Sequence, residues 1–177
     1  MTAGATVRPA TPADLPDIQR IYAHHVMTGL ASFEEIAPDL AEMTRRFTTL
    51  VEAGFPYLVA ELDGRVVGYS YCGPYRPRPA YRYSVENSVY LAPESAGRGI
   101  GRLLLSALIE RATALGKRQM VAVIGDSANH ASIGLHQALG FRRVGVIEGA
   151  GFKHGRWVDS VLMQRALGPG LAAPPTT

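Results

Sequence analysis

The 177-residue chain is 47% hydrophobic and 19% charged, which is typical of one globular domain with a full core. It has no run of about 18 apolar residues and no basic-then-apolar N-terminus, so we expect neither a membrane span nor a secretory signal. Its net charge of +3 comes from scattered lysines and arginines, which argues against a nucleic-acid partner. The single cysteine, Cys72, excludes an internal disulfide and favours a cytoplasmic location.

Cap and turn residues divide the chain into alternating elements. Thr11-Pro12 with Asp14 forms a capping-box pattern, and apolar residues recur behind it at helical spacing as far as Val26. Asp63-Gly64 is a strong hairpin signal between two strands. We expect strands at residues 6–8, 57–62, 65–72, 81–91, 119–124, 141–147 and 157–162, and helices after Thr11 and at residues 38–53, 100–115 and 129–140.

This order, βααβββαβαββ, predicts one α/β (α+β) domain over residues 6–167. The sheet is expected to be mixed, mostly antiparallel and twisted, with flanking helices and one parallel crossover. Residues 148–156 are predicted to form a loop between the last two strands. Residues 1–5 are expected to fray, and the small, proline-rich residues 168–177 to be disordered.

Residues 86–115 carry the strongest functional signal. A strand stops at Pro93, and residues 97–101, with the sequence GRGIG, lead directly into an apolar helix. The first amides of a helix lack internal partners, and glycines let a ligand approach the backbone, so this turn predicts a phosphate site. The turn does not fit a P-loop, which needs lysine where this chain has Arg102. It does not fit a dinucleotide fingerprint either, because counting from Gly97 places Arg102 at the third glycine position. A purely structural glycine turn is the alternative.

The glycine turn resembles motif A of the GCN5-related N-acetyltransferases, Gln/Arg-x-x-Gly-x-Gly/Ala. Gly99 and Gly101 occupy its glycine positions, whereas Ala96 replaces the Gln/Arg. Residues 31–34, 74–82, 85–90 and 155–159 resemble the phosphinothricin / methionine sulfoximine N-acetyltransferase subgroup, so the resemblance covers nearly the whole chain.

The resemblance implies the acyl-CoA N-acyltransferase fold, acetyl-CoA as co-substrate and no metal. It implies direct transfer of acetyl, through a tetrahedral intermediate, to the α-amino group of a small amino acid or analogue such as phosphinothricin or methionine sulfoximine/sulfone. Because relatives are commonly homodimers, it also implies a homodimer. A non-catalytic acyl-CoA sensor and an enzyme acting on protein amines are the alternatives.

The resemblance also assigns the cofactor positions. The pantetheine arm would lie along the strand before the glycine turn, and the pyrophosphate on the turn itself. Asn129 would contact the arm from the other side, although a plain helix N-cap would also explain this residue. The implied positions are Val89, Tyr90, Leu91, Gly97, Arg98, Gly99, Ile100, Gly101, Arg102, Asn129 and Ser132.

Two residues are candidates for proton transfer. Glu86 would take a proton from the amine, directly or through water; the alternative is a strand carboxylate paired with an arginine such as Arg82. His136 would protonate the leaving thiolate of coenzyme A; the alternative is a satisfied core histidine.

Arginines in a proline-rich loop are the candidates for recognition of the acceptor. Arg76 and Arg78 offer planar donor groups suited to a carboxylate or phosphinate, although solvated loop arginines would also explain them. The full set of expected acceptor-binding residues is Phe33, Glu34, Arg76, Arg78, Asn87 and Ser88.

Overall fold

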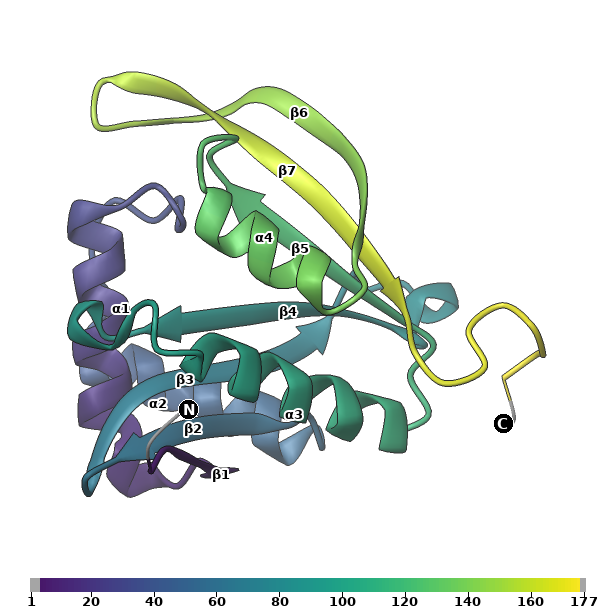
Figure 1. The fold of residues 1–177 in the computed structure, drawn as a ribbon, viewed down its shortest axis with the longest axis horizontal. Coiled ribbons are helices and arrows are strands. Elements are labelled where there is room, and N and C mark those ends of the chain that lie inside the picture. The colour runs from purple at the N-terminus through teal and green to yellow at the C-terminus, as the bar shows by residue number, and fades with distance from the viewer. Residues whose placement is uncertain (1–3, 176–177) are drawn as a thin grey trace.

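The computed structural model describes residues 4–175, in which seven strands form one sheet in the order β1-β2-β3-β4-β5-β7-β6. Helices lie on both faces of the sheet (Figure 1). The predicted element order and the mixed, mostly antiparallel sheet are confirmed. The strands are β1 (Thr6–Pro9), β2 (Tyr57–Leu62), β3 (Arg65–Pro74), β4 (Ser84–Leu91), β5 (Gln119–Gly125), β6 (Arg142–Lys153) and β7 (Arg156–Ala166), and the helices are α1 (Leu15–Thr28), α2 (Leu40–Glu52), α3 (Ile100–Ala114) and α4 (His130–Ala138).

The start of α1 is held by a buried carboxylate. Asp14 accepts hydrogen bonds from the Thr11 N–H at 2.7 Å and the Thr11 hydroxyl at 3.0 Å. Two guanidinium nitrogens of Arg8 also donate to it, each at 2.8 Å. The hydrogen bonds from Arg8 are the largest cause of the low pKa of Asp14, which is lowered to about 2. The capping pattern therefore also ties β1 to the first helix.

Two apolar cores lie on opposite faces of the sheet. Alternate residues of β2 supply them, because successive strand side chains point to opposite faces: Leu58 and Ala60 pack under α3, whereas Tyr57 and Val59 pack under α1 and α2. Burial of these side chains holds the helices against the sheet. The largest fully buried side chains include Ile18, Ile21, Leu58, Tyr69, Ile100, Leu104, Leu105, Leu108, Met120 and Met163.

The sheet opens between its two parallel strands. β4 and β5 pair from Ser84 with Gln119 as far as Asn87 with Ala122, and the pairing stops there. β4 stays paired with β3 up to Leu91, so within residues 4–175 no strand pairs with residues 88–91 on the β5 side. The Leu91 carbonyl lies 2.7 Å from His25 Nε2. Figure 1 shows the two strands diverging towards their C-terminal ends. A free strand edge of this kind can pair with an extended ligand.

The predicted loop over residues 148–156 is wrong. β6 continues to Lys153 and β7 begins at Arg156, so only His154 and Gly155 form the turn. The glycines that suggest a loop lie where β6 is irregular. Its pairing register with β7 shifts between Ile147 and Gly151. The last two strands therefore form a long hairpin that projects beyond the rest of the sheet (Figure 1).

The chain continues beyond β7 as a series of turns. Arg118 donates hydrogen bonds to the carbonyls of Gly170, at 3.3 Å, and Pro174, at 2.8 Å. Residues 1–3 and 176–177, for which fraying and disorder are predicted, lie outside the described residues. Between residues 4 and 175, no helix has the length and apolar character needed to cross a membrane.

Candidate active site

Two adjoining cavities lie where β4 and β5 separate. The first, here called the β4 cleft, has a volume of about 480 Å³ and is lined by residues that include Phe33, Glu34, Glu86, Ser88 and Tyr90. The second, here called the β4–β5 groove, runs along the unpaired edge of β4. Asn87, Ser88, Val89, Tyr90, Asn129, Ser132 and His136 are among the residues that line it.

The glycine turn presents free backbone donors. Within the described residues, no N–H group of residues 97–101 donates to another protein group. Gly97 and Gly99 have φ angles of +74° and +78°, a left-handed conformation that favours glycine. Arg98 and Arg102 are exposed beside these amides and add positive charge. The turn thus has the donors and charge that a pyrophosphate requires.

The two predicted cofactor positions at the start of α4, Asn129 and Ser132, line the groove. The Asn129 side-chain oxygen accepts a hydrogen bond from the Ser132 N–H at 3.2 Å, so Asn129 is a true helix N-cap. Both residues also line the β4–β5 groove, opposite the free edge of β4. The capping role and a position facing a ligand therefore coexist at Asn129, and neither excludes the other.

Glu86 lies in the β4 cleft without an ion-pair partner. Among residues 4–175, no lysine, arginine or histidine forms a salt bridge with it. The proposed alternative partner, Arg82, instead stacks over the Tyr83 ring, with its guanidinium carbon 4.7 Å from the ring centroid. Burial raises the pKa of Glu86, and the charge of Arg76 partly opposes this shift. A half-buried carboxylate with a raised pKa is suited to accept a proton.

His136 is buried between the groove and the core. Its side chain is 3% exposed, with Nδ1 2.8 Å from the Ser132 carbonyl and Nε2 3.1 Å from the Asn87 amide. Burial lowers the pKa of His136, which favours the neutral ring. Both ring nitrogens face oxygen atoms, the Ser132 carbonyl and the Asn87 Oδ1, so a neutral ring donates to one of the two. The Asn87 Nδ2 donates to the Val121 carbonyl at 3.4 Å. The structure thus joins His136 to Asn87, another predicted site residue.

The predicted acceptor-binding residues are only partly brought together. Phe33 packs on the backbone of the β6–β7 hairpin so closely that a Cβ at Gly151 would lie 2.7 Å from its ring. Glu34 pairs with Arg46 at 2.6 Å, and both Phe33 and Glu34 line the β4 cleft. Arg76 and Arg78 are exposed and do not line the cleft, and the Arg76 guanidinium lies 5.0 Å from the Tyr75 ring centroid.

Several side chains near the site were not predicted from the sequence. Arg46 of α2 neutralises Glu34, and the Tyr22 hydroxyl lies 2.9 Å from that of Ser32. Tyr69 and Tyr71 extend a ring cluster from the cleft across β3. Their spacing, two residues apart in a predicted strand, is the one signal that places both on the same face of the sheet.

Comparison with known proteins identifies the family to which this chain belongs. An acetyltransferase (GNAT) domain model matches residues 7–162. A phosphinothricin N-acetyltransferase of Alcaligenes faecalis is 55% identical over 165 residues, which cover 93% of this chain and 84% of that protein. An L-methionine sulfoximine/L-methionine sulfone acetyltransferase of Pseudomonas aeruginosa is 45% identical over 171 residues, 96% of this chain and 99% of its own.

A crystal structure shows the same fold. The phosphinothricin acetyltransferase of Sinorhizobium meliloti, solved in complex with acetyl-CoA, superposes with a TM-score of 0.95 at 52% identity. The match covers 99% of this chain and 94% of that one. This chain therefore belongs to the GNAT family of acetyltransferases. The predicted enzyme class, an acetyl-CoA-dependent N-acetyltransferase, is confirmed, as is the predicted fold.

Proposed function

We propose that this enzyme acetylates the α-amino group of a small amino acid or analogue, such as phosphinothricin or methionine sulfoximine/sulfone. The observation that carries the proposal is Glu86, a half-buried carboxylate without an ion-pair partner in residues 4–175. It lies in a cleft of about 480 Å³ beside the edge of β4 that β5 leaves. A cleft of this size suits an amino acid rather than a folded protein segment. The names of the two relatives compared above support the same acceptors.

Each part of the chemistry has a candidate group on this chain. Acetyl-CoA would lie along Val89, Tyr90 and Leu91, with its pyrophosphate on residues 97–102 and its arm facing Asn129 and Ser132. Holding the thioester beside the amine contributes several kcal/mol through orientation alone, about 7–11 kcal/mol at the upper limit.

Proton transfer would use the two ionisable groups of the site. Glu86 would take a proton from the acceptor ammonium, directly or through one water, and leave a neutral amine. A backbone N–H of β4 near Val89 would stabilise the oxyanion that develops during attack. His136 would return a proton to the departing thiolate.

The acceptor's own anion needs a partner, for which we propose the loop after β3. Arg76 is exposed on this loop, and its charge acts on the pKa of Glu86 against the effect of burial. A modest movement of this exposed side chain would let it meet the carboxylate of a bound amino acid. Arg78, Asn87 and Ser88 would complete the recognition of the acceptor.

We also propose that the enzyme is a cytoplasmic homodimer. Four large apolar side chains of the β6–β7 hairpin are more than half exposed: Val144, Ile147, Phe152 and Trp157 are 52%, 53%, 56% and 70% accessible. Apolar residues grouped on one element favour contact with another protein surface. The one cysteine, Cys72, is buried and free, which suits a reducing compartment. Analytical ultracentrifugation at micromolar concentration tests the oligomeric state.

The experiment that tests the function measures release of free coenzyme A thiol from acetyl-CoA. Methionine sulfoximine, phosphinothricin and a peptide with a free N-terminus are the three acceptors, and a reaction without acceptor is the blank. We expect acceptor-dependent release with the two small compounds. Release only with the peptide would indicate a protein acetyltransferase, and acetyl-CoA binding without release would indicate the sensor.

A further inference from the structure

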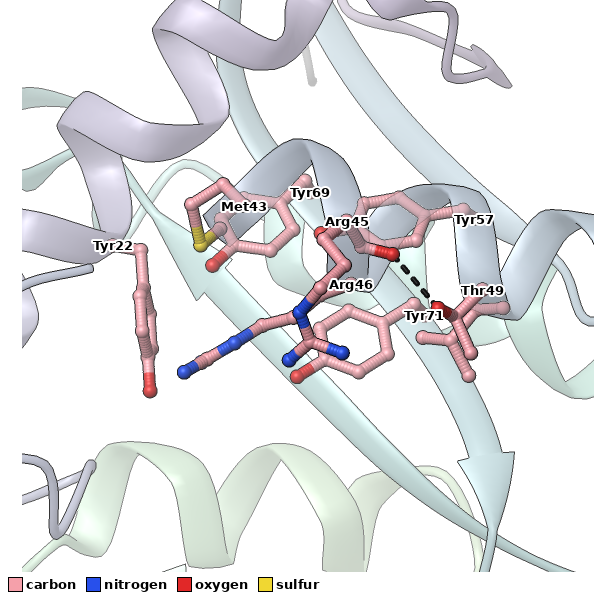
Figure 2. A pocket seen from close by; sticks show the side chains of 9 residues that line it. Tyr22, Met43, Arg45, Arg46, Thr49, Tyr57, Tyr69 and Tyr71 are labelled. Atoms are coloured by element: carbon pink, nitrogen blue, oxygen red, sulfur yellow. Dashed lines mark hydrogen bonds between the residues drawn. The ribbon is translucent and has the colours of Figure 1, made fainter. Parts of the chain in front are cut away.

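A third cavity lies beside the β4 cleft, under α2. It has a volume of about 260 Å³ and is lined chiefly by Tyr22, Tyr57, Tyr69 and Tyr71, with Arg46 and Thr49 at its α2 side (Figure 2). We call it the tyrosine cavity. The mechanism proposed above uses none of its residues.

The tyrosine cavity and the β4 cleft lie over the same face of the sheet. Tyr71 is paired with Ser88, and Tyr69 with Tyr90, in the antiparallel register of β3 and β4. Side chains of directly paired residues point to the same face, so the tyrosines and the β4 residues of the cleft share one side of the sheet. Tyr22 of α1 lines both cavities. The two spaces are therefore neighbours on one surface.

A salt bridge links the lining of the tyrosine cavity to the lining of the β4 cleft. Glu34 lines the cleft, Arg46 lines the tyrosine cavity, and the two form a salt bridge of 2.6 Å. Both side chains are about one-third exposed, at 34% and 38%. Exposed ion pairs of this kind contribute only about 0–1 kcal/mol, so this salt bridge can open at small cost when a ligand competes for it.

The walls of the tyrosine cavity define what it can accept. The rings of Tyr57 and Tyr71 are stacked with centroids 4.9 Å apart, and Met43 and Leu50 add apolar surface. The charged groups that line it are the guanidinium groups of Arg45 and Arg46, and no carboxylate of the described chain is among its lining residues. The rings and apolar side chains suit flat or polarisable neutral groups, and the positive charge of Arg45 and Arg46 disfavours a cation.

We propose that the tyrosine cavity is a side chamber of the β4 cleft, which receives the distal end of the acceptor's side chain and favours neutral aromatic or thioether groups over cationic ones. The proposal rests on the proposed function, because it assumes an amino acid whose α-amine lies at Glu86. It predicts that phenylalanine and methionine are better acceptors than lysine at its α-amine.

A pair of adjacent threonines on α2 allows a matched test. Thr49 lines the tyrosine cavity, whereas Thr48 is exposed and does not. Thr49→Trp would fill the mouth of the cavity with an indole, and Thr48→Trp places the same ring on the same helix outside it. Thr49→Val controls for loss of the Thr49 hydroxyl, which donates to the Arg45 carbonyl at 2.8 Å. Both positions are exposed, so we expect all three variants to fold.

The readout is kcat/KM for phenylalanine and methionine divided by kcat/KM for alanine, whose side chain is too short to reach the cavity. We expect Thr49→Trp to lower this ratio at least tenfold and the other two variants to change it less than twofold. The KM for acetyl-CoA and the Tm, measured in parallel, report whether each variant retains its fold.

An unchanged ratio in Thr49→Trp would overturn the side chamber while the proposed function stands. An equal loss in Thr49→Trp and Thr48→Trp would also overturn it, since a general effect on α2 explains that result. Failure of the unmodified enzyme to acetylate any amino acid would instead overturn the proposed function, and this inference with it.

Discussion

Two carboxylates in the wall of the β4 cleft have different surroundings. Glu34 is neutralised by Arg46 at 2.6 Å, whereas Glu86 has no ion-pair partner among the described residues. Burial raises the pKa of Glu86, which makes it the better suited of the two for the proposed proton-accepting role. At the scale of single residues, the chemistry of the site therefore depends on which carboxylate remains unpaired.

Glu86→Gln should lower kcat by about 10²–10⁴-fold, because it removes the proton acceptor while keeping the side-chain shape. The KM for acetyl-CoA should not change. The unmodified enzyme should lose kcat/KM as pH falls through the raised pKa of Glu86, since the protonated carboxyl cannot act as a base. A pH profile of both proteins checks this, and persistence of the acidic limb in the variant would assign that limb to another group.

His136→Phe should slow turnover at least tenfold. The change removes the proton donor proposed for the thiolate and also leaves the Asn87 side chain without its 3.1 Å partner. His136→Gln, which can still hydrogen-bond to Asn87, separates these two causes. Turnover at the normal rate in His136→Phe would leave His136 a structural residue only; recovery in the Gln variant would assign the loss to the position of Asn87.

Asp14→Asn should lower the free energy of unfolding by about 2 kcal/mol near neutral pH. The pKa of Asp14 is lowered to about 2 in the fold, so its stabilising effect is present above the ordinary carboxyl pKa and is lost as pH falls from about 4 towards 2. The exposed Asp17, paired with Arg20 at 3.2 Å, is the matched control. Urea unfolding at pH 7 and pH 3 should show a smaller pH effect in Asp14→Asn than in Asp17→Asn.

At the scale of elements, α3 connects the fold to the cofactor site. Its N-terminal turn needs left-handed residues at Gly97 and Gly99, and its C-terminal turn needs one at Gly116, where φ is +74°. The same helix therefore has two glycine-dependent ends, but the presence of free amides beside the groove distinguishes only the first.

Gly99→Ala and Gly116→Ala should each destabilise the fold by about 1 kcal/mol, because alanine is strained at positive φ. Only Gly99→Ala should also raise the KM for acetyl-CoA, by roughly tenfold, since a displaced N-terminal turn moves the phosphate donors. Thermal unfolding and steady-state kinetics measure the two effects separately. A comparable KM for both variants would place the pyrophosphate elsewhere.

At the scale of the whole molecule, the β6–β7 hairpin holds the loop between α1 and α2 over the cleft. Lys153 is buried, 3% exposed, and its Nζ donates to the Ser32 carbonyl at 2.7 Å. These two residues are 121 positions apart in the chain. The cleft is thus closed by elements from both ends of the sequence, so its shape depends on the hairpin as a unit.

Lys153→Met should raise the KM for the acceptor about tenfold while leaving the KM for acetyl-CoA unchanged, because the loop with Phe33 and Glu34 loses its buried tether. Lys117→Met is the control, since Lys117 also donates to a carbonyl, that of Arg82 at 2.8 Å, but through a solvent-exposed hydrogen bond. Equal effects of the two substitutions, or an effect on acetyl-CoA, would contradict a tether specific to the acceptor side.

Much of the fold was predictable because its signals are local. The Asp63-Gly64 hairpin, the Gly116 helix end and the glycine turn each depend on a few neighbouring residues, and the structure has all three. The length of β6 was not predictable, because its glycines read as a loop unless the pairing with β7 is known. Among the site residues, Glu86 and the glycine turn could be located from local pattern and resemblance, whereas the Glu34–Arg46 pair could not.

The amino-acid sequence by itself determined the order of the elements, the helix caps and the glycine turn. The backbone conformation of each depends on side chains only a few positions apart. Only the tertiary structure decided that the sheet opens after Asn87, that Glu86 has no ion-pair partner in the described part of the chain, and that a tyrosine cavity lies beside the cleft. Those features depend on sheet order and register, which bring together side chains from distant segments and set which charges neutralise one another.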